Sequence, residues 1–423
     1  MIRTIFVGLL LATMSPCMWA AMPESLPESS AYKGEIQRGA DGRLKVLAPE
    51  ASSLPTAGAS SSVATMIVGP LEKISTVTEA AKRARDGEVI EIRPGEYRGQ
   101  PAIWTQNKLL IRGSGARPVM IADGKDAEGK AIWVVRGGDV RIENIEFRGA
   151  RVASGNGAGI RFERGHLAIH RCAFFDNEMG VLTANLPGMT LAVSDSEFAA
   201  APRTPGDLHH LLYVGAIGRF ELSGSRFEQG YIGHLVKSRA RENYVRYNLL
   251  VDGAEGRASY ELEFPNGGVA YVVGNVIGQS AGTDNPVLVS YGAEGPRWPE
   301  NALFLAHNTL LNDFHAGAFL KVWNEKFPAG IETWAINNLT VGYGDLFPPA
   351  QGRFEGNRSA LRRDLLDYGG LPLRLNSVSS LRGSVRIPGQ AGGVNLLPDA
   401  EFVFPVGKRP VRLGNSLAPG AFQ

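Results

Sequence analysis

The amino-acid sequence predicts an all-β fold: a single-stranded right-handed parallel β-helix, in which successive coils of one chain stack into a solenoid. Three observations predict it. A short apolar pattern recurs with a period of 23 to 33 residues, and the chain contains 52 glycines, which suit frequent tight turns. A helix-forming segment precedes the first repeats, and the last sixty or so residues lack the pattern. We therefore expect a capped solenoid with an irregular C-terminal segment.

A complete copy of the repeat spans eight residues. Apolar residues occupy positions 1, 3 and 8, and a small or polar residue usually occupies position 6. Copies occur as VRIENIEF (140–147), LAIHRCAF (167–174), LAVSDSEF (191–198), FELSGSRF (220–227), VRYNLL (245–250), YVVGNVI (271–277), LFLAHNTL (303–310) and WAINNLT (334–340), and LLIRGS (109–114) adds an earlier coil. Position 6, the repeat position, is occupied by Ile145, Cys172, Ser196, Ser225, Asn248, Asn275, Asn308 and Asn338, of which all but Ile145 are small or polar. Stacked coils bury their apolar faces against each other, so Asn248, Asn275 and Asn308 should form an internal ladder of amides. A leucine-rich repeat shares the period but needs a different leucine spacing and a helical segment.

The N-terminal region predicts export. Residues 1–21 contain one cation at Arg3, an apolar run from Ile5 to Met14 and small residues at Ala20 and Ala21, which are typical of a signal peptide. The apolar run is too short for a membrane span. We expect a secreted or periplasmic protein, a flexible lead-in over residues 22–65, which are rich in Pro, Ser and Ala, and a monomer as the favoured state.

The β-helix is expected over residues 66–345, including its N-terminal cap, with a closing segment over 346–423. Residues 74–99 contain a capping box, Thr76 with Glu79, and an Ala-rich helix that ends at Asp86-Gly87. Such a helix would cover the exposed strand edges of the first coil. The helix, the following turn and Pro94-Gly95-Glu96-Tyr97 resemble the beginning of the pectate-lyase-like β-helix superfamily, and the tail resembles its closing segment.

The overall charge excludes one large class of function. The chain has 44 Lys and Arg against 42 Asp and Glu, a formal net charge of +2. Nucleic-acid-binding proteins usually carry a strong excess of positive charge on one face. A nucleic-acid partner is therefore not expected.

Each coil has a second strand about a dozen residues before the repeat position. These strands read AGIRFE (158–163), GVLTAN (180–185), LLYVG (211–215), HLVKSR (234–239), SYELEF (259–264), VLVSYG (287–292) and AFLKVW (318–323). Because side chains alternate along a strand, Tyr260, Leu262 and Phe264 should face inward. Outward positions should then be taken by Tyr213, Leu235, Lys237, Arg239, Glu261, Glu263, Lys321 and Trp323.

These outward residues are expected to be neighbours. Tyr213, Lys237 and Glu263 lie 12, 11 and 12 residues before their repeat positions, and stacked strands are about 4.8 Å apart. The histidines His209, His210 and His234 fall close to the same stripe, Arg241 falls at the next turn, and Trp323 could stack on a sugar ring. Such a stripe is either a set of solubilising ion pairs of little net energy or a groove for an acidic polysaccharide.

The second interpretation suggests β-elimination from a uronate. Arg239 suits the pairing with a carboxylate. Lys237 could remove the C5 proton if crowding by Arg239 and Arg241 lowers its pKa, although a stacked glutamate opposes that change. Tyr213 or a histidine such as His210 could protonate the leaving oxygen.

The stretch VKSRARENYVRYN (236–248) is similar to the chondroitinase B and alginate lyase family of polysaccharide lyases. The resemblance implies that Lys237 is the base and that it is framed by Ser238, Asn243, Tyr244 and Asn248. The family has two calcium-binding carboxylates just before the lysine, where this chain has Gly230 to Ile232, so Ca²⁺ is possible but its ligands are not matched. The family's arginine on the next coil is matched here by Glu263 to Asn266.

Other functions remain open at this point. Glu261 and Glu263, at i and i+2 on one strand face, would be about 6.5–7 Å apart, which is compatible with an inverting glycoside hydrolase. A C5-epimerase would use similar proton chemistry, and a glycan-binding, adhesin-like solenoid would use none. We favour a lyase.

Overall fold

A computed structural model describes residues 62–204, 208–346, 349, 352–411 and 417–423, and the backbone of 35–38 and 44–47. The expected signal peptide, residues 1–21, lies outside the described residues. Most of the expected lead-in, residues 22–65, also lies outside the described residues. Within it, β1 (Glu35–Arg38) and β2 (Leu44–Leu47) pair antiparallel.

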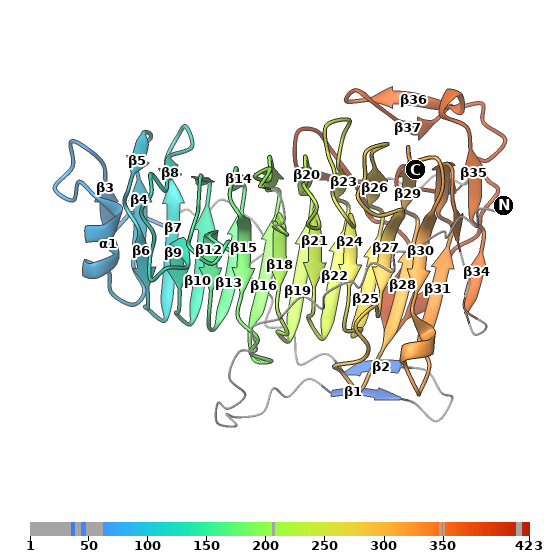
Figure 1. Ribbon diagram of the computed structural model, residues 1–423, viewed down its shortest axis with the longest axis horizontal. Coiled ribbons are helices and arrows are strands. Elements are labelled where there is room, and N and C mark those ends of the chain that lie inside the picture. The colour runs from blue at the N-terminus through green and yellow to red at the C-terminus, as the bar shows by residue number, and fades with distance from the viewer. Residues whose placement is uncertain are drawn as a thin grey trace, which may run out of the picture. The chain divides into compact units, whose positions relative to one another are not determined.

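Three long parallel sheets form the body of the protein, and each complete coil contributes one strand to each sheet (Figure 1). The first has twelve strands, β3 (Met66–Val68), β4 (Val89–Ile92), β7 (Lys108–Gly113), β10 (Asp139–Glu143), β13 (His166–His170), β16 (Thr190–Ser194), β19 (Arg219–Ser223), β22 (Glu242–Arg246), β25 (Val269–Val273), β28 (Ala302–Ala306), β31 (Glu332–Ile336) and β34 (Arg353–Glu355). The second has eleven, β5 (Glu96–Arg98), β8 (Val119–Ile121), β11 (Glu146–Arg148), β14 (Ala173–Phe175), β17 (Glu197–Ala199), β20 (Arg226–Glu228), β23 (Leu249–Val251), β26 (Val276–Gln279), β29 (Thr309–Asn312), β32 (Leu339–Gly342) and β35 (Arg358–Ala360). The third has ten, β6 (Ala102–Trp104), β9 (Ala131–Val135), β12 (Ala158–Phe162), β15 (Met179–Thr183), β18 (Leu212–Val214), β21 (Val236–Ser238), β24 (Leu262–Phe264), β27 (Val287–Tyr291), β30 (Ala318–Val322) and β33 (Asp345–Leu346).

The prediction of a right-handed parallel β-helix is confirmed. Because neighbouring strands are in register, identical positions of successive coils stack in the interior. In the second sheet the rings of Phe147, Phe174, Phe198 and Phe227 stack with centroids 5.2, 4.6 and 4.5 Å apart. Such contacts add to the burial of apolar area that holds the coils together.

The predicted polar ladder of Asn248, Asn275 and Asn308 is confirmed, and it continues through Asn338 to Asn357. The backbone N–H of Ser225 donates to the side-chain oxygen of Asn248 at 2.9 Å, and that of Asn248 donates to Asn275 at 3.0 Å. Asn275 donates in the same way to Asn308, and Asn308 to Asn338, each at 2.9 Å. Asn338 then donates to Asn357 at 3.0 Å. The ladder satisfies backbone donors that the turn would otherwise leave unpaired in the core.

A short helix covers the first coil, as predicted, but it differs in detail. Helix α1 (Val77–Arg83) begins after Thr76, whose hydroxyl accepts from the Glu79 N–H at 3.2 Å. The Glu79 carboxylate pairs with Arg83 at 2.9 Å, so no reciprocal bond of the capping box is seen. The helix ends three residues before Asp86. The side-chain amide of Gln106 donates to the carbonyls of Ala81 and Ala84 and so joins the helix to the coil below it.

The C-terminal part departs from the expected boundary. The solenoid continues beyond residue 345 through β34 and β35, which pair with β31 and β32, and Asn357 adds a further step to the ladder. The short 3₁₀ helix η1 (Asn324–Lys326) follows β30, and η2 (Arg362–Asp364) follows the last coil. Three antiparallel hairpins complete the chain: β36 (Leu365–Tyr368) with β37 (Leu371–Leu375), β38 (Gln390–Ala391) with β39 (Val394–Asn395), and β40 (Ala400–Phe402) with β41 (Lys408–Pro410).

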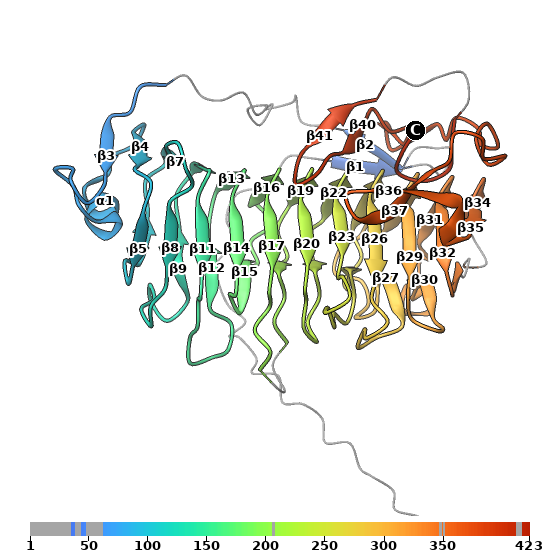
Figure 2. The same cartoon turned by 90° about the horizontal axis from the view of Figure 1, so that it is seen from above.

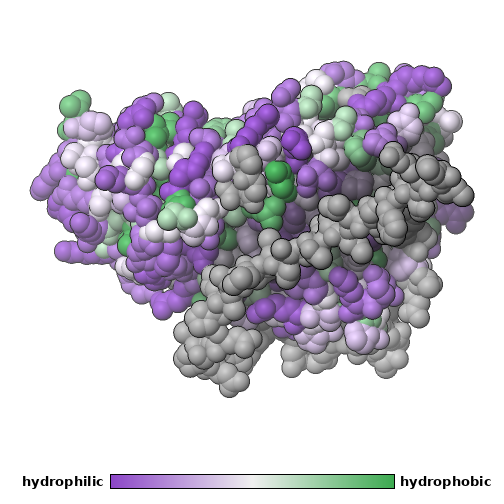
Figure 3. Space-filling view, in the orientation of Figure 1, coloured by the Kyte–Doolittle hydropathy of each residue, from purple (hydrophilic) through white to green (hydrophobic). Residues whose placement is uncertain are grey.

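The closing segment packs on two of the three sheets (Figure 2). Leu373 and Phe402 pack in one cluster with Leu311 and Val341, on the outer face of the second sheet. Leu396 packs with residues on the outer face of the first sheet. On the face shown in Figure 3, the described residues are mainly hydrophilic, with hydrophobic residues in small scattered groups. No helix within the described ranges is long and apolar enough to cross a membrane.

Candidate active site

The predicted stripe of outward residues lies on the ten-stranded sheet. In register, Tyr213 on β18 is paired with Lys237 on β21, and Lys237 is paired with Glu263 on β24. The prediction that these three residues are neighbours is confirmed. The same row continues to Ser290 on β27 and Lys321 on β30.

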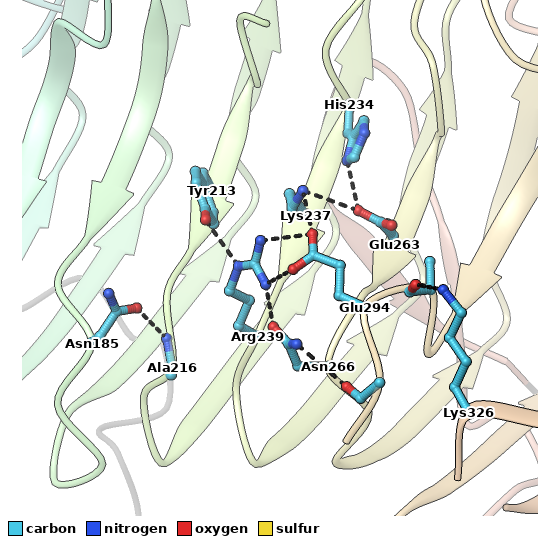
Figure 4. A network of polar contacts seen from close by, with 12 residues as sticks. Asn185, Tyr213, Ala216, His234, Lys237, Arg239, Glu263, Asn266, Glu294 and Lys326 are labelled. Carbon is cyan, nitrogen blue, oxygen red and sulfur yellow. Dashed lines mark hydrogen bonds and ion pairs between the residues drawn. The ribbon is translucent and has the colours of Figure 1, made fainter. Parts of the chain in front are cut away.

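Two carboxylates approach the ammonium group of Lys237. Its Nζ lies 3.4 Å from Oε2 of Glu263 and 3.5 Å from Oε1 of Glu294 (Figure 4). Glu294 belongs to the segment between β27 and β28. The side chains of Lys237 and Glu263 are only 10% and 4% exposed, so their ion pair is shielded from water, whereas the Glu294 side chain is 37% exposed.

Arg239 is the centre of the polar network. Its guanidinium donates two hydrogen bonds to the carboxylate of Glu294, at 2.5 and 2.9 Å, and a third from Nε to the Tyr213 hydroxyl at 2.9 Å. It also contacts the side-chain oxygen of Asn266. Burial disfavours the charged guanidinium, but Glu294 and Tyr213 outweigh burial and raise the pKa of Arg239. The arrangement is a two-point receptor for a carboxylate.

Two histidines extend the cluster. The His210 and His234 rings are tilted against each other with centroids 4.6 Å apart. His234 meets Tyr260 edge-on at 5.0 Å, and His210 meets Tyr213 edge-on at 5.2 Å. The backbone N–H of His234 donates to Nδ1 of His210 at 2.8 Å, which leaves the proton of a neutral ring on Nε2. Burial, followed by the nearby His234, Lys237 and Arg239, holds the pKa of His210 well below its usual value.

The Glu263 carboxylate is held in its ionised form. Its Oε2 lies 3.1 Å from Nδ1 of His234 as well as close to Lys237. Burial opposes ionisation, but these two neighbours outweigh it and lower the pKa of Glu263. Burial also lowers the pKa of His234, and Glu263 offsets this only in part. Near neutral pH the pair is therefore a carboxylate beside a neutral imidazole.

The expectation that Glu261 faces outward is wrong. Glu261 is fully buried, as is Leu235, which was also expected outside, whereas Tyr260 is partly exposed rather than inward. The reason is that β24 begins only at Leu262 and β21 only at Val236. The strict alternation of a strand does not extend back into the turn, so two successive residues point inward at this corner. Glu261 and Glu263 therefore lie on opposite sides of the sheet.

The other residues predicted to bind substrate are His209, Arg241, Lys321 and Trp323, and they lie outside the polar network around Arg239. His209 is 1% exposed and forms an isolated β-bridge with Tyr231, so its side chain is enclosed and is not presented to a substrate beside the stripe. Arg241 pairs with Glu300 at 3.2 Å, outside the cluster. Trp323 donates to Ser290 at 3.3 Å and so joins the outward row. Two ammonium groups lie near the Trp323 ring, those of Lys321 at 3.6 Å and Lys326 at 4.9 Å from its centroid.

Three of the four residues that the resemblance places around Lys237 have internal positions, and Tyr244 lies on the outer face of a different sheet. The Ser238 hydroxyl donates to the side-chain oxygen of Asn243 at 2.5 Å, and both residues are fully buried. Asn248 belongs to the ladder, and Tyr244 lies on β22 of another sheet. Ser238, Asn243 and Asn248 shape the coil beneath Lys237, and none of the four lines the outer face that carries Lys237.

Sequence reasoning missed Glu294, Asn266 and Ser290 as site residues. Ser290 could have been found, because it lies 27 residues after Glu263 and continues the outward row. Glu294 and Asn266 lie in turns of variable length, where the period of the repeat carries no information. Their contacts with Arg239 depend on the path of those turns.

The site does not fit calcium. Residues 230–232 are Gly, Tyr and Ile, which supply no carboxylate. In the part of the chain that the structure describes, no group of three or more His, Cys, Asp or Glu residues is arranged to hold a metal ion. A separate hollow of about 330 Å³ lies near the C-terminal end, lined by Asn337, Arg353, Arg358 and Arg386 among others, away from Lys237.

Comparisons with known proteins give likenesses of architecture. No protein-family model matches the chain, and no curated protein matches it. It is similar to the crystal structure of pectate lyase Pel9A, with a TM-score of 0.48 and 13% identity over 79% of this chain and 96% of that one. A PL6 family polysaccharide lyase from Pseudopedobacter saltans gives a TM-score of 0.37 and 12% identity, over 67% and 90%. ORF18 of Geobacillus virus E2 gives 0.35 and 13%, over 78% and 72%.

Proposed function

We propose that the protein cleaves an acidic, uronate-containing polysaccharide by β-elimination. One observation carries the proposal: a lysine, a tyrosine hydroxyl and a guanidinium that already binds a carboxylate at two points converge on one outward face of the solenoid. These are the groups that the reaction requires. The export expected from the N-terminal region would bring such an enzyme to extracellular or periplasmic polymers.

The proposed roles follow from the contacts. Arg239, with Asn266, binds the uronate carboxylate and stabilises the negative charge that develops there when the neighbouring C5–H bond breaks. Lys237, in its neutral form, takes the C5 proton. The electron pair of the C5–H bond forms the C4=C5 double bond, and the C4–O bond breaks. The Tyr213 hydroxyl accepts its hydrogen bond from Arg239, so its own proton is free to be donated to the leaving oxygen.

The structure removes the basis of the hydrolase alternative. An inverting hydrolase needs two carboxyl groups on either side of one glycosidic bond. Glu261 is enclosed in the core, whereas Glu263 lies on the outer face and is occupied by Lys237 and His234. The expected pair therefore does not exist.

The test is incubation of the purified protein with pectate, alginate, chondroitin and hyaluronate, with and without a chelator. A lyase produces unsaturated uronates, which are detected by their ultraviolet absorbance. Replacing a general base costs about 10²–10⁴-fold in rate, so Lys237→Ala should lose at least about a hundredfold of the activity. Lys408→Ala, a matched change on exposed β41, should keep it.

Folding of the Lys237→Ala variant is checked by circular dichroism, because the change leaves the buried Glu263 with fewer partners. Near-normal elimination by a folded Lys237→Ala protein would contradict the assigned base. New reducing ends without a double bond would contradict the reaction class. Binding without any cleavage would instead indicate a glycan-binding solenoid.

A further inference from the structure

The carboxylate of Glu294 occupies a position that a substrate carboxylate would need. It receives two hydrogen bonds from Arg239, and its Oε1 lies 3.5 Å from Nζ of Lys237. Arg239 also contacts Asn266, so one anionic group is held by a guanidinium and lies close to an ammonium. A uronate that presented its C5–H to Lys237 would place its own carboxylate at the same cations.

Glu294 differs from the other charged members of the cluster in exposure. Its side chain is 37% exposed, whereas those of Lys237 and Arg239 are each 10% exposed and that of Glu263 is 4% exposed. The cations and Glu263 are therefore largely buried. Glu294 approaches them from the solvent side, where a ligand would also approach.

The backbone that carries Glu294 is anchored independently of its carboxylate. The Glu294 N–H donates to the Pro265 carbonyl at 2.8 Å, and the Arg297 N–H donates to that of Asn266 at 3.0 Å. The indole N–H of Trp298 donates to the Arg239 carbonyl at 2.9 Å. The Glu294 side chain can therefore rotate away from Arg239 while the segment stays in place.

We propose that Glu294 is an internal substitute for the substrate carboxylate, and that a substrate binds by exchanging its own carboxylate for that of Glu294. This inference rests on the proposed function. It makes Glu294 a specificity-determining residue, because a neutral sugar offers nothing to replace two charge-assisted hydrogen bonds to a shielded guanidinium. Release of Glu294 also removes one of the two carboxylates beside Lys237, at the moment when that lysine must accept a proton.

The experiment compares binding by the wild type, Glu294→Gln and Glu300→Gln. Each variant removes one negative charge from the same segment, but Glu300 pairs with Arg241 and not with Arg239. Dissociation constants for pectate, alginate, chondroitin and hyaluronate, and for a neutral glucan, are measured by affinity electrophoresis. Loss of a competing carboxylate should tighten binding of the acidic glycan by about tenfold, which corresponds to about 1.4 kcal/mol. The neutral glucan should not gain, and Glu300→Gln should change binding far less.

Each outcome decides the inference. An equal gain in both variants would show that net charge alone is responsible and would overturn it. So would unchanged binding in a folded Glu294→Gln protein, or no binding of any acidic glycan by the wild type and this variant. A selective gain by Glu294→Gln without formation of unsaturated product would support the carboxylate exchange while contradicting the lyase reaction, so the two proposals fail separately.

Discussion

At the scale of single residues, Glu261 occupies a place that apolar residues take in the neighbouring coils. It precedes Leu262 as Leu235 precedes Val236 and Leu288 precedes Val289, and these strands are paired in register. Neither of its side-chain oxygens has a hydrogen-bond partner in another described residue. A buried polar group without partners destabilises the folded state.

Replacing this carboxyl group should stabilise the protein. We expect Glu261→Leu to raise the free energy of unfolding by about 2 kcal/mol near neutral pH, since it removes an unpaired buried polar group. Urea unfolding followed by circular dichroism measures the change. A loss of stability would indicate that the carboxyl group has a partner or a task of its own.

The gain should depend on pH. Burial, reinforced by Asp252, raises the pKa of Glu261 well above its ordinary 4.5, and burial likewise raises that of Asp252 to about 6. The folded state therefore binds protons that the unfolded chain releases, and stability falls as pH rises above 4.5. The advantage of Glu261→Leu should be smallest near pH 4 and grow towards pH 8. Glu261→Gln, which cannot ionise, should lose most of this site's pH dependence while it still buries a polar group.

At the scale of elements, the asparagine ladder joins consecutive coils. The Asn275 amide donates to the Val245 carbonyl at 2.9 Å and to Asn308 at 3.0 Å, and its oxygen accepts from the backbone and side chain of Asn248 at 3.0 and 2.9 Å. All of these groups are buried. Each rung therefore satisfies polar groups on two neighbouring coils.

Asn275→Ala should lower the free energy of unfolding by about 3 kcal/mol, because it leaves a buried N–H and a buried carbonyl without partners. The matched change Asn357→Ala, at the partly exposed end of the ladder, should have a much smaller effect. Thermal unfolding of the two variants tests this difference. Equal losses would mean that the ladder contributes through local turn structure instead of depth of burial.

At the scale of the whole described molecule, the closing segment packs on sheets that do not carry the candidate site, and so it does not cover that site. Its clusters cover outer faces of the first and second sheets in the later coils. The cluster around Lys237 lies on the third sheet. The fold thus uses its C-terminal segment to bury apolar outer faces that do not carry the site.

Phe402→Ala should loosen this cover. Phe402 is 1% exposed, and truncation of a buried phenylalanine costs about 3–5 kcal/mol. We expect faster proteolysis after the last coil and greater binding of a hydrophobic dye. Val378→Ala, at an 85% exposed position of the same segment, serves as the control and should change neither. Unaltered proteolysis of Phe402→Ala would contradict this role.

The sequence by itself determined the solenoid, the asparagine ladder, the capping helix and the neighbourhood of Tyr213, Lys237 and Glu263. It could do so because in-register stacking makes each coil repeat the environment of the one before it, and a repeated environment leaves a period in the sequence. Only the tertiary structure decided that Glu261 is enclosed and that Glu294 binds Arg239. Both are consequences of turns, which begin and end the strands at different residues in each coil and follow no period.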